Sequence, residues 1–232
     1  MPAEPQRPPP AAGRRYSTFV GLAFLVLIVI ATLSTIRSQG SGILGVSKTD
    51  TGMPLPEFAV PNARGHKVDL DANIAQDDCS TSQNPCPSDA QRTPACEIPE
   101  QGAIRVCDLF DRPLVLSFWF TRGADCLPVQ DALDRVAARY RGRVNFLSID
   151  VRDDVGEVRD IIEERGWSIP VGYDRDGAVS NLYRIGVCPT VAFAYPGGIL
   201  AFATIDQMSV GMVTDDVQRL LRQSRRRAQA SR

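Results

Sequence analysis

In the second half of the chain, segments that have the hydrophobic pattern of buried strands alternate with segments that have the pattern of amphipathic helices. The apolar run PLVLSFWF at residues 113–120 has the length of a buried strand, and residues 127–140 follow with apolar side chains at helical spacing. A second strand is predicted at residues 144–149, and a second helix begins at Val155 and ends before Gly166. Such alternation requires parallel strands joined by crossover helices.

The pattern after this point predicts a hairpin between two helices. We expect a short helix over residues 178–183, strands over 190–195 and 199–204, and a final helix whose apolar side chains include Val217 and Leu220. Pro196-Gly197-Gly198 supplies the turn between the two strands. A chain of this kind is predicted to be α/β, with a central mixed sheet flanked by helices.

The amino-terminal part carries a charge-free apolar run from Thr18 to Ile36. Because about 20 apolar residues cross a bilayer as a helix, residues 16–36 are predicted to be a transmembrane anchor that contacts membrane lipid. A cleaved secretory signal is the alternative, but it has a shorter apolar region and a small-residue cleavage site. Arginines that precede the run favour a cytoplasmic amino terminus and an extracytoplasmic domain at the cell membrane.

The anchor divides the chain into five predicted parts. These are a Pro-rich cytoplasmic tail at 1–15, the anchor at 16–36, a Gly/Ser-rich linker at 37–53, a folded domain at 54–222 and a basic tail at 223–232. Within the folded domain, residues 72–107 are polar and lack periodicity, which indicates a Cys-rich irregular insertion.

Charge and histidine content exclude several functions. The formal net charge of −1 argues against a general nucleic-acid-binding protein. The chain has a single histidine, His66, which lies in a turn-like stretch. This content argues against a His-rich metal site and against a Ser-His-Asp hydrolase.

Three segments resemble the thioredoxin superfamily in its order and spacing. LPEFAVPNARGHKVDL resembles the opening hairpin, LVLSFWFTRGADC resembles the strand that leads into the active-site helix, and GVCPTVAFAYPGG resembles the cis-proline loop with its following hairpin. The nearest branch is the redoxin group, which contains membrane-tethered thiol–disulfide interchange proteins of the TlpA/ResA type and is related to the alkyl hydroperoxide reductase/thiol-specific antioxidant family. The resemblance implies a thioredoxin-like fold, a protein or peptide thiol or disulfide as substrate, and no cofactor.

The resemblance also assigns residues, with departures at the site itself. The family's C-x-x-C motif falls on residues 123–126, so Gly123 replaces the attacking cysteine and Cys126 is the second one. Ser117 occupies the position of the buried acid that accepts a proton in thioredoxins, and Arg122 that of the tryptophan before the motif. Pro189 matches the cis-proline, and Cys188 precedes it.

Six cysteines form two sets. The four cysteines in or beside the insertion are predicted to pair among themselves as structural disulfides. The alternative is a four-cysteine zinc site. These four residues are Cys79, Cys86, Cys96 and Cys107. Cys126 and Cys188 are implied by the fold to be neighbours. They are interpreted as a redox pair, a fixed structural disulfide or two inert thiols.

Three functions follow from these readings. An extracytoplasmic thiol–disulfide oxidoreductase would use Cys126 and Cys188, with Pro189 in the site. A redox-inactive module would instead hold a partner peptide at the cis-proline loop. Peroxide reduction is the weakest hypothesis, because Thr121 lies five residues before Cys126 and the P-x-x-x-T-x-x-C pattern is not met.

Overall fold

The computed structural model describes most of the carboxyl-terminal part of the chain and short pieces of the rest. The described residues are 20, 22–29, 51–65, 75–76, 80–81, 84–85, 95–97, 99, 102–123 and 125–230. Contacts between residues divide the chain into two compact units, Met1–Gly42 and Ile43–Arg232. The two units are described separately below.

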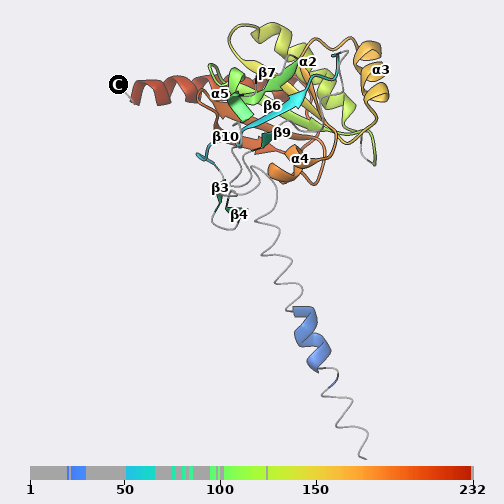
Figure 1. Cartoon of the computed structure of the whole chain (residues 1–232). Helices are drawn as coiled ribbons and strands as arrows, with labels where there is room; N and C mark the ends of the chain where they lie inside the picture. Colours follow the sequence, from blue (N-terminus) through green and yellow to red (C-terminus); the bar gives the residue numbers. More distant parts are fainter. Residues whose placement is uncertain are drawn as a thin grey trace, which may run out of the picture. The chain divides into compact units, whose positions relative to one another are not determined.

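The second unit is built on a five-stranded mixed sheet with the order β10-β9-β6-β7-β8 (Figure 1). Its strands are β6 (Leu114–Trp119), β7 (Asn145–Val151), β8 (Val171–Asp174), β9 (Thr190–Tyr195) and β10 (Ile199–Thr204). The three strands β6, β7 and β8 are parallel, whereas β9 and β10 run antiparallel to their neighbours. The predicted mixed sheet is therefore confirmed.

Helices cover both faces of this sheet, as the alternating pattern predicted. They are α2 (Leu127–Tyr140), α3 (Val155–Arg165), α4 (Ala178–Leu182) and α5 (Val210–Ala230). Apolar side chains of α2 and α5 pack on the face that carries Val115 and Phe193. The opposite face carries Leu116 and packs against α4 and the β1 layer. The side chains of one strand thus alternate between two cores, as the period of two requires.

The amino-terminal strand β1 (Phe58–Pro61) pairs with two strands from the predicted insertion, β2 (Ala75–Gln76) and β5 (Ala103–Arg105). The expected short hairpin within residues 55–70 is therefore not the observed pairing. The prediction that the insertion is irregular up to residue 107 is wrong at its end, where β5 and the 3₁₀ helix Val106–Leu109 join the fold. These strands are too short to show a period in the sequence.

Two further short elements lie inside the insertion. The strands β3 (Ser80–Thr81) and β4 (Asn84–Pro85) pair with each other, and residues Ala95–Glu97 form a 3₁₀ helix. Most of the remaining residues of the insertion, Cys79 and Cys86 among them, lie outside the described residues.

Strand β8 was missed by the sequence patterns. It is short and centred on Gly172, a residue depleted in strands. The glycine is required because β1 passes close by at this point, where Asn62 forms a bridge with Gly172. A Cβ atom at Gly172 would lie 2.6 Å from Val60 Cγ2 and 2.7 Å from Ile149 Cδ1.

The last helix is longer than predicted. Helix α5 continues through the residues expected to form a basic tail and ends at Ala230, and Figure 1 shows this end extending beyond the sheet. Arginine, alanine and glutamine favour helix, and no glycine or proline interrupts the segment. Only Val213, Val217 and Leu220 of α5 are buried, so the second half of the helix carries a largely exposed basic surface.

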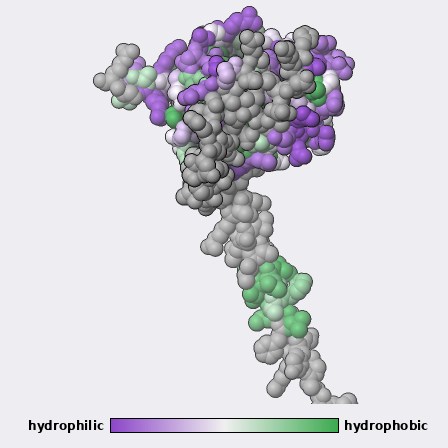
Figure 2. Space-filling view, viewed as in Figure 1, coloured by the Kyte–Doolittle hydropathy of each residue, from purple (hydrophilic) through white to green (hydrophobic). Residues whose placement is uncertain are grey.

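In the first unit, residue 20 and residues 22–29 are helical and expose apolar side chains, which form a hydrophobic surface in Figure 2. Among the described residues, no helix has both the length and the hydropathy needed to cross a bilayer. Most of the predicted anchor, residues 16–36, lies outside the described residues.

Candidate functional site at the Cys126–Cys188 disulfide

The structure joins Cys126 and Cys188 across 62 residues of sequence. Their Cα atoms are 5.8 Å apart, inside the range of about 4.4–6.8 Å that a disulfide requires. One cysteine comes from the start of α2 and the other from the loop before β9. The fold therefore joins the two cysteines that match the family's redox positions, although the 123–126 motif itself contains a single cysteine.

Cys126 is the residue at the amino-terminal cap of α2. Its carbonyl oxygen accepts the backbone N–H groups of Val129 and Gln130, and Pro128 lies in the first turn, where its missing N–H costs no hydrogen bond. The partial positive charge at a helix amino terminus stabilises a nearby anion. A thiolate released at Cys126 would therefore be stabilised by the helix that carries it.

Cys188 is the more accessible of the two residues. Cys126 is 0% exposed, whereas Cys188 is 9% exposed and follows Val187, which is 38% exposed. The peptide bond between Cys188 and Pro189 is cis, as the resemblance implied, and Pro189 itself is buried. A thiolate from outside would meet the disulfide at the Cys188 sulfur first.

Two tryptophans form the apolar wall of the site. The rings of Trp119 and Trp167 meet edge to face at 5.2 Å between centroids and belong to the same buried cluster as the two cysteines. Trp119 ends β6, and Trp167 follows α3. The disulfide therefore belongs to a buried cluster that also includes the end of β6 and the segment after α3.

Asp153 holds the loop that runs from β6 to the disulfide. Its carboxylate accepts the backbone N–H of Thr121 at 2.5 Å and lies 3.5 Å from the Arg122 guanidinium. The next residue, Gly123, is exposed, has a φ of +86° and would meet no heavy atom within 4 Å of an added Cβ. The position of the family's attacking cysteine is thus an open turn that here carries no side chain.

A cluster of buried polar side chains lies between α2 and the sheet. Ser117 and Ser148 each donate a hydrogen bond to the Gln130 Oε1 atom, at 2.9 and 2.8 Å. The serine at the position of the thioredoxin acid is therefore a hydrogen-bond donor to α2. No carboxylate occupies that position.

A buried carboxyl group lies instead on the adjacent strand, β7. Asp150 is fully buried, pairs in register with Trp119 on one side and Tyr173 on the other, and neither of its oxygens meets a hydrogen-bond partner among the described residues. Burial raises the pKa of Asp150 from 3.8 to about 9, and the nearby carboxylate of Asp153 adds to the rise. Asp150 is therefore protonated at neutral pH.

The insertion contributes a second disulfide, between Cys96 and Cys107, with Cα atoms 5.8 Å apart. The Glu57 Oε2 atom lies 2.8 Å from the Cys96 sulfur. These three residues offer ligand atoms within 4.8 Å of one another, but the two sulfurs are engaged in the disulfide and cannot act as thiolate ligands. The Cys96–Cys107 bond agrees with the expected pairing within the insertion, and the participation of Cys79 and Cys86 in such pairing stays a prediction.

Sequence patterns missed the polar residues of the site. Asp150 and Asp153 stand at the carboxyl end of a buried strand, and Gln130 interrupts the apolar face of α2, which are signals that favour a site. Their roles became evident only when the strands and helices were placed together.

The mixed sheet with helices on both faces is a thioredoxin-like fold. The solved structure of a protein described as a thiol:disulfide interchange protein DsbE from Chlorobium tepidum is similar over 74% of this chain and 98% of its own, with a TM-score of 0.54 and 14% identity. A carboxyl-terminal domain described as a thiol-disulfide oxidoreductase from Bacteroides thetaiotaomicron has a TM-score of 0.52 at 14% identity, over 76% of this chain and 99% of its own. Both likenesses show the fold.

Sequence comparison finds a specific relative. The thiol-disulfide oxidoreductase ResA of Oceanobacillus iheyensis is 27% identical over 118 residues, which are 50% of this chain. The chain spans 59% of the length of that relative. No family model matches the chain. The similarity to ResA, together with the shared fold, confirms the resemblance to the redoxin group of the thioredoxin superfamily.

Proposed function

We propose that the protein is an extracytoplasmic thiol–disulfide oxidoreductase that uses Cys126 and Cys188 as its redox pair. The observation that carries the proposal is the disulfide between the capping residue of α2 and the residue before the cis-proline. The arrangement supplies two sulfurs for thiol–disulfide exchange at a site where Gly123 replaces the family's attacking cysteine. The relative from Oceanobacillus iheyensis, a thiol-disulfide oxidoreductase, supports the same class of reaction.

The exposure of the two cysteine residues, 0% for Cys126 and 9% for Cys188, sets the order of steps. A substrate thiolate attacks the Cys188 sulfur, the Cys126–Cys188 bond breaks, and Cys126 leaves as a thiolate beside the amino terminus of α2. A second substrate thiolate attacks the substrate sulfur of the mixed disulfide and releases Cys188. The substrate loses two electrons and the protein gains them; the reverse sequence reduces a substrate disulfide.

The experiment measures disulfide reduction by the pre-reduced full chain in mild detergent, with insulin as substrate. Cys126→Ser and Cys188→Ser are each expected to reduce the rate to the uncatalysed background. The matched control, Cys96→Ser/Cys107→Ser, removes the other described disulfide and is expected to retain activity. Equal rates in the wild type and in Cys126→Ser would contradict the proposal.

The open turn at Gly123 favours a second candidate, a thioredoxin-fold module that binds a partner peptide without exchange chemistry. Its features are the missing nucleophile and the exposed Val187 beside the cis-proline. A wild-type protein that is fully reduced yet inactive, and that captures its partner equally well with Cys188→Ser, would favour this alternative. Nothing in the comparisons supports the peroxide-reducing hypothesis.

We also propose that residues 16–36 anchor the protein in the cell membrane, with the domain outside. The support is the charge-free run and the exposed apolar side chains of residues 20 and 22–29 (Figure 2). Protease added to intact spheroplasts is expected to digest the domain and leave a membrane-bound amino-terminal fragment. Full protection of the domain would refute this orientation.

A further inference from the structure

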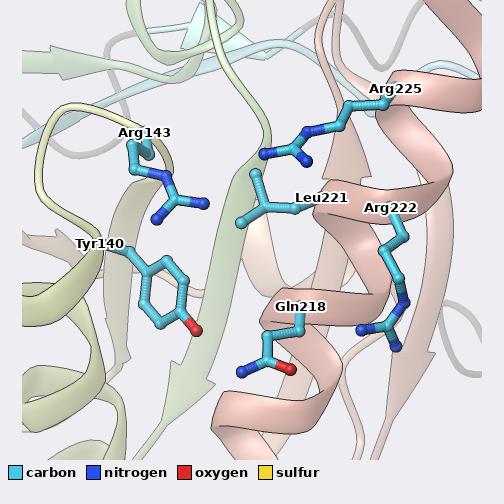
Figure 3. Close-up of a pocket in the computed structure, with 6 residues that line it drawn as sticks. All are labelled: Tyr140, Arg143, Gln218, Leu221, Arg222 and Arg225. Carbon is cyan, nitrogen blue, oxygen red and sulfur yellow. The ribbon is translucent and has the colours of Figure 1, made fainter.

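A cavity of about 260 Å³ lies between the carboxyl end of α2 and the second half of α5. Its walls come from the turn after α2 and from successive turns of α5 (Figure 3), and the lining residues are Tyr140, Arg143, Gln218, Leu221, Arg222 and Arg225. Tyr140 belongs to the core between α2, α5 and the sheet, whereas Cys126 and Cys188 belong to a different buried cluster. The cavity is therefore separate from the disulfide.

Positive charge dominates the cavity. Three arginines line it, and among the residues that the structure describes no aspartate or glutamate does. Within the same described part, neither Arg222 nor Arg225 pairs with an acidic side chain. Figure 3 shows Arg143 and Arg225 extending toward the same space from opposite sides of Leu221. A hollow lined by charge of one sign concentrates ions of the opposite sign.

Tyr140 adds a neutral hydroxyl group to the lining of the cavity. The residue is only 8% exposed, and its ring packs under the Arg143 guanidinium, 5.4 Å from the ring centroid. Its hydroxyl points into the space between the two helices (Figure 3). The hydroxyl is open to the cavity, where it can donate a hydrogen bond to an acceptor atom of a ligand.

We propose that this cavity binds a phosphate group, carried by inorganic phosphate, by a small phosphomonoester or by the headgroup of an anionic lipid. Guanidinium groups match phosphate oxygens in geometry and charge, and the Tyr140 hydroxyl and the Gln218 amide add neutral donors. The volume lies below the roughly 300–1,000 Å³ of sites for drug-sized ligands, which fits a small anion or headgroup.

The test is calorimetric titration of the oxidised full chain in neutral detergent at constant low ionic strength. The probes are inorganic phosphate, glycerol 3-phosphate and short-chain phosphatidylglycerol, with short-chain phosphatidylcholine as the zwitterionic comparison. Arg143→Gln/Arg225→Gln removes one guanidinium from each side of the cavity. The matched control, Arg141→Gln/Arg226→Gln, removes one charge from the same turn and one from the same helix outside the cavity.

The cavity variant is expected to bind at least about tenfold more weakly than the wild type, because charge-assisted hydrogen bonds contribute most of the affinity. The control variant is expected to keep wild-type affinity, and Tyr140→Phe to weaken binding with an unchanged melting temperature. Binding of the soluble phosphates assigns a soluble ligand, and binding of phosphatidylglycerol alone assigns the headgroup. Equal losses in both double variants, or no binding of any probe, would overturn the proposal.

Discussion

Replacing Asp150 by asparagine is expected to stabilise the protein at neutral and alkaline pH. The wild-type carboxyl is buried between Trp119 and Tyr173 with no hydrogen-bond partner for either oxygen among the described residues. An ionised carboxylate is therefore strongly disfavoured in the native state. Asparagine has nearly the same shape and remains neutral at every pH.

The sign and size follow from the pKa of Asp150. The unfolded chain releases this proton near pH 3.8, whereas the native protein holds it up to about pH 9. Native-state stability thus falls as pH rises through this window, by about 1.36 kcal/mol per pH unit for one proton. At pH 7 the buried carboxyl lowers the free energy of unfolding by up to about 4 kcal/mol. Asp150→Asn removes this loss.

The assay is urea unfolding of the oxidised full chain at pH 5, 7 and 8.5. The two tryptophans of the chain, Trp119 and Trp167, both lie in this cluster, so their fluorescence reports on it. The gap in unfolding free energy between the variant and the wild type should widen with pH. Some pH dependence will remain in Asp150→Asn, because burial also raises the pKa of Asp174. A gap that is constant or narrows with rising pH would refute the reasoning.

Further predictions concern packing, capping and disulfide pairing. Gly172→Ala places a Cβ against Val60 and Ile149 and should cost about 1–3 kcal/mol in urea unfolding, whereas Gly186→Ala, which meets no atom, should change stability by less than about 0.5 kcal/mol. Asp154 accepts the N–H groups of Gly156 and Glu157 at the start of α3, so Asp154→Ala should cost about 1 kcal/mol, and the exposed mid-helix change Asp160→Ala should not. Non-reducing peptide mapping of the oxidised protein should recover Cys96 linked to Cys107 and Cys126 linked to Cys188; a link between these two pairs would contradict the described pairing.

The sequence alone was sufficient for the fold class and for the principal helices and strands of the domain. The apolar run before Phe120, the helical spacing after Cys126 and the hairpin turn at Pro196 each report on neighbouring residues, and hydrophobic period is a local property. Ordered motifs also carried the resemblance to thioredoxins. That resemblance, through the known place of the cis-proline loop, implied that Cys126 and Cys188 are neighbours.

Only the tertiary structure decided which strands pair with β1, why position 172 is glycine and which carboxyl is protonated. Strand pairing joins Ala59 to Ala75 and Arg105 across a polar insertion, and no local period encodes such partners. The pKa of Asp150 depends on residues from β6, β8 and the loop after β7 that together exclude water. Desolvation sums contributions from segments far apart in the chain, so it exists only after the chain has folded.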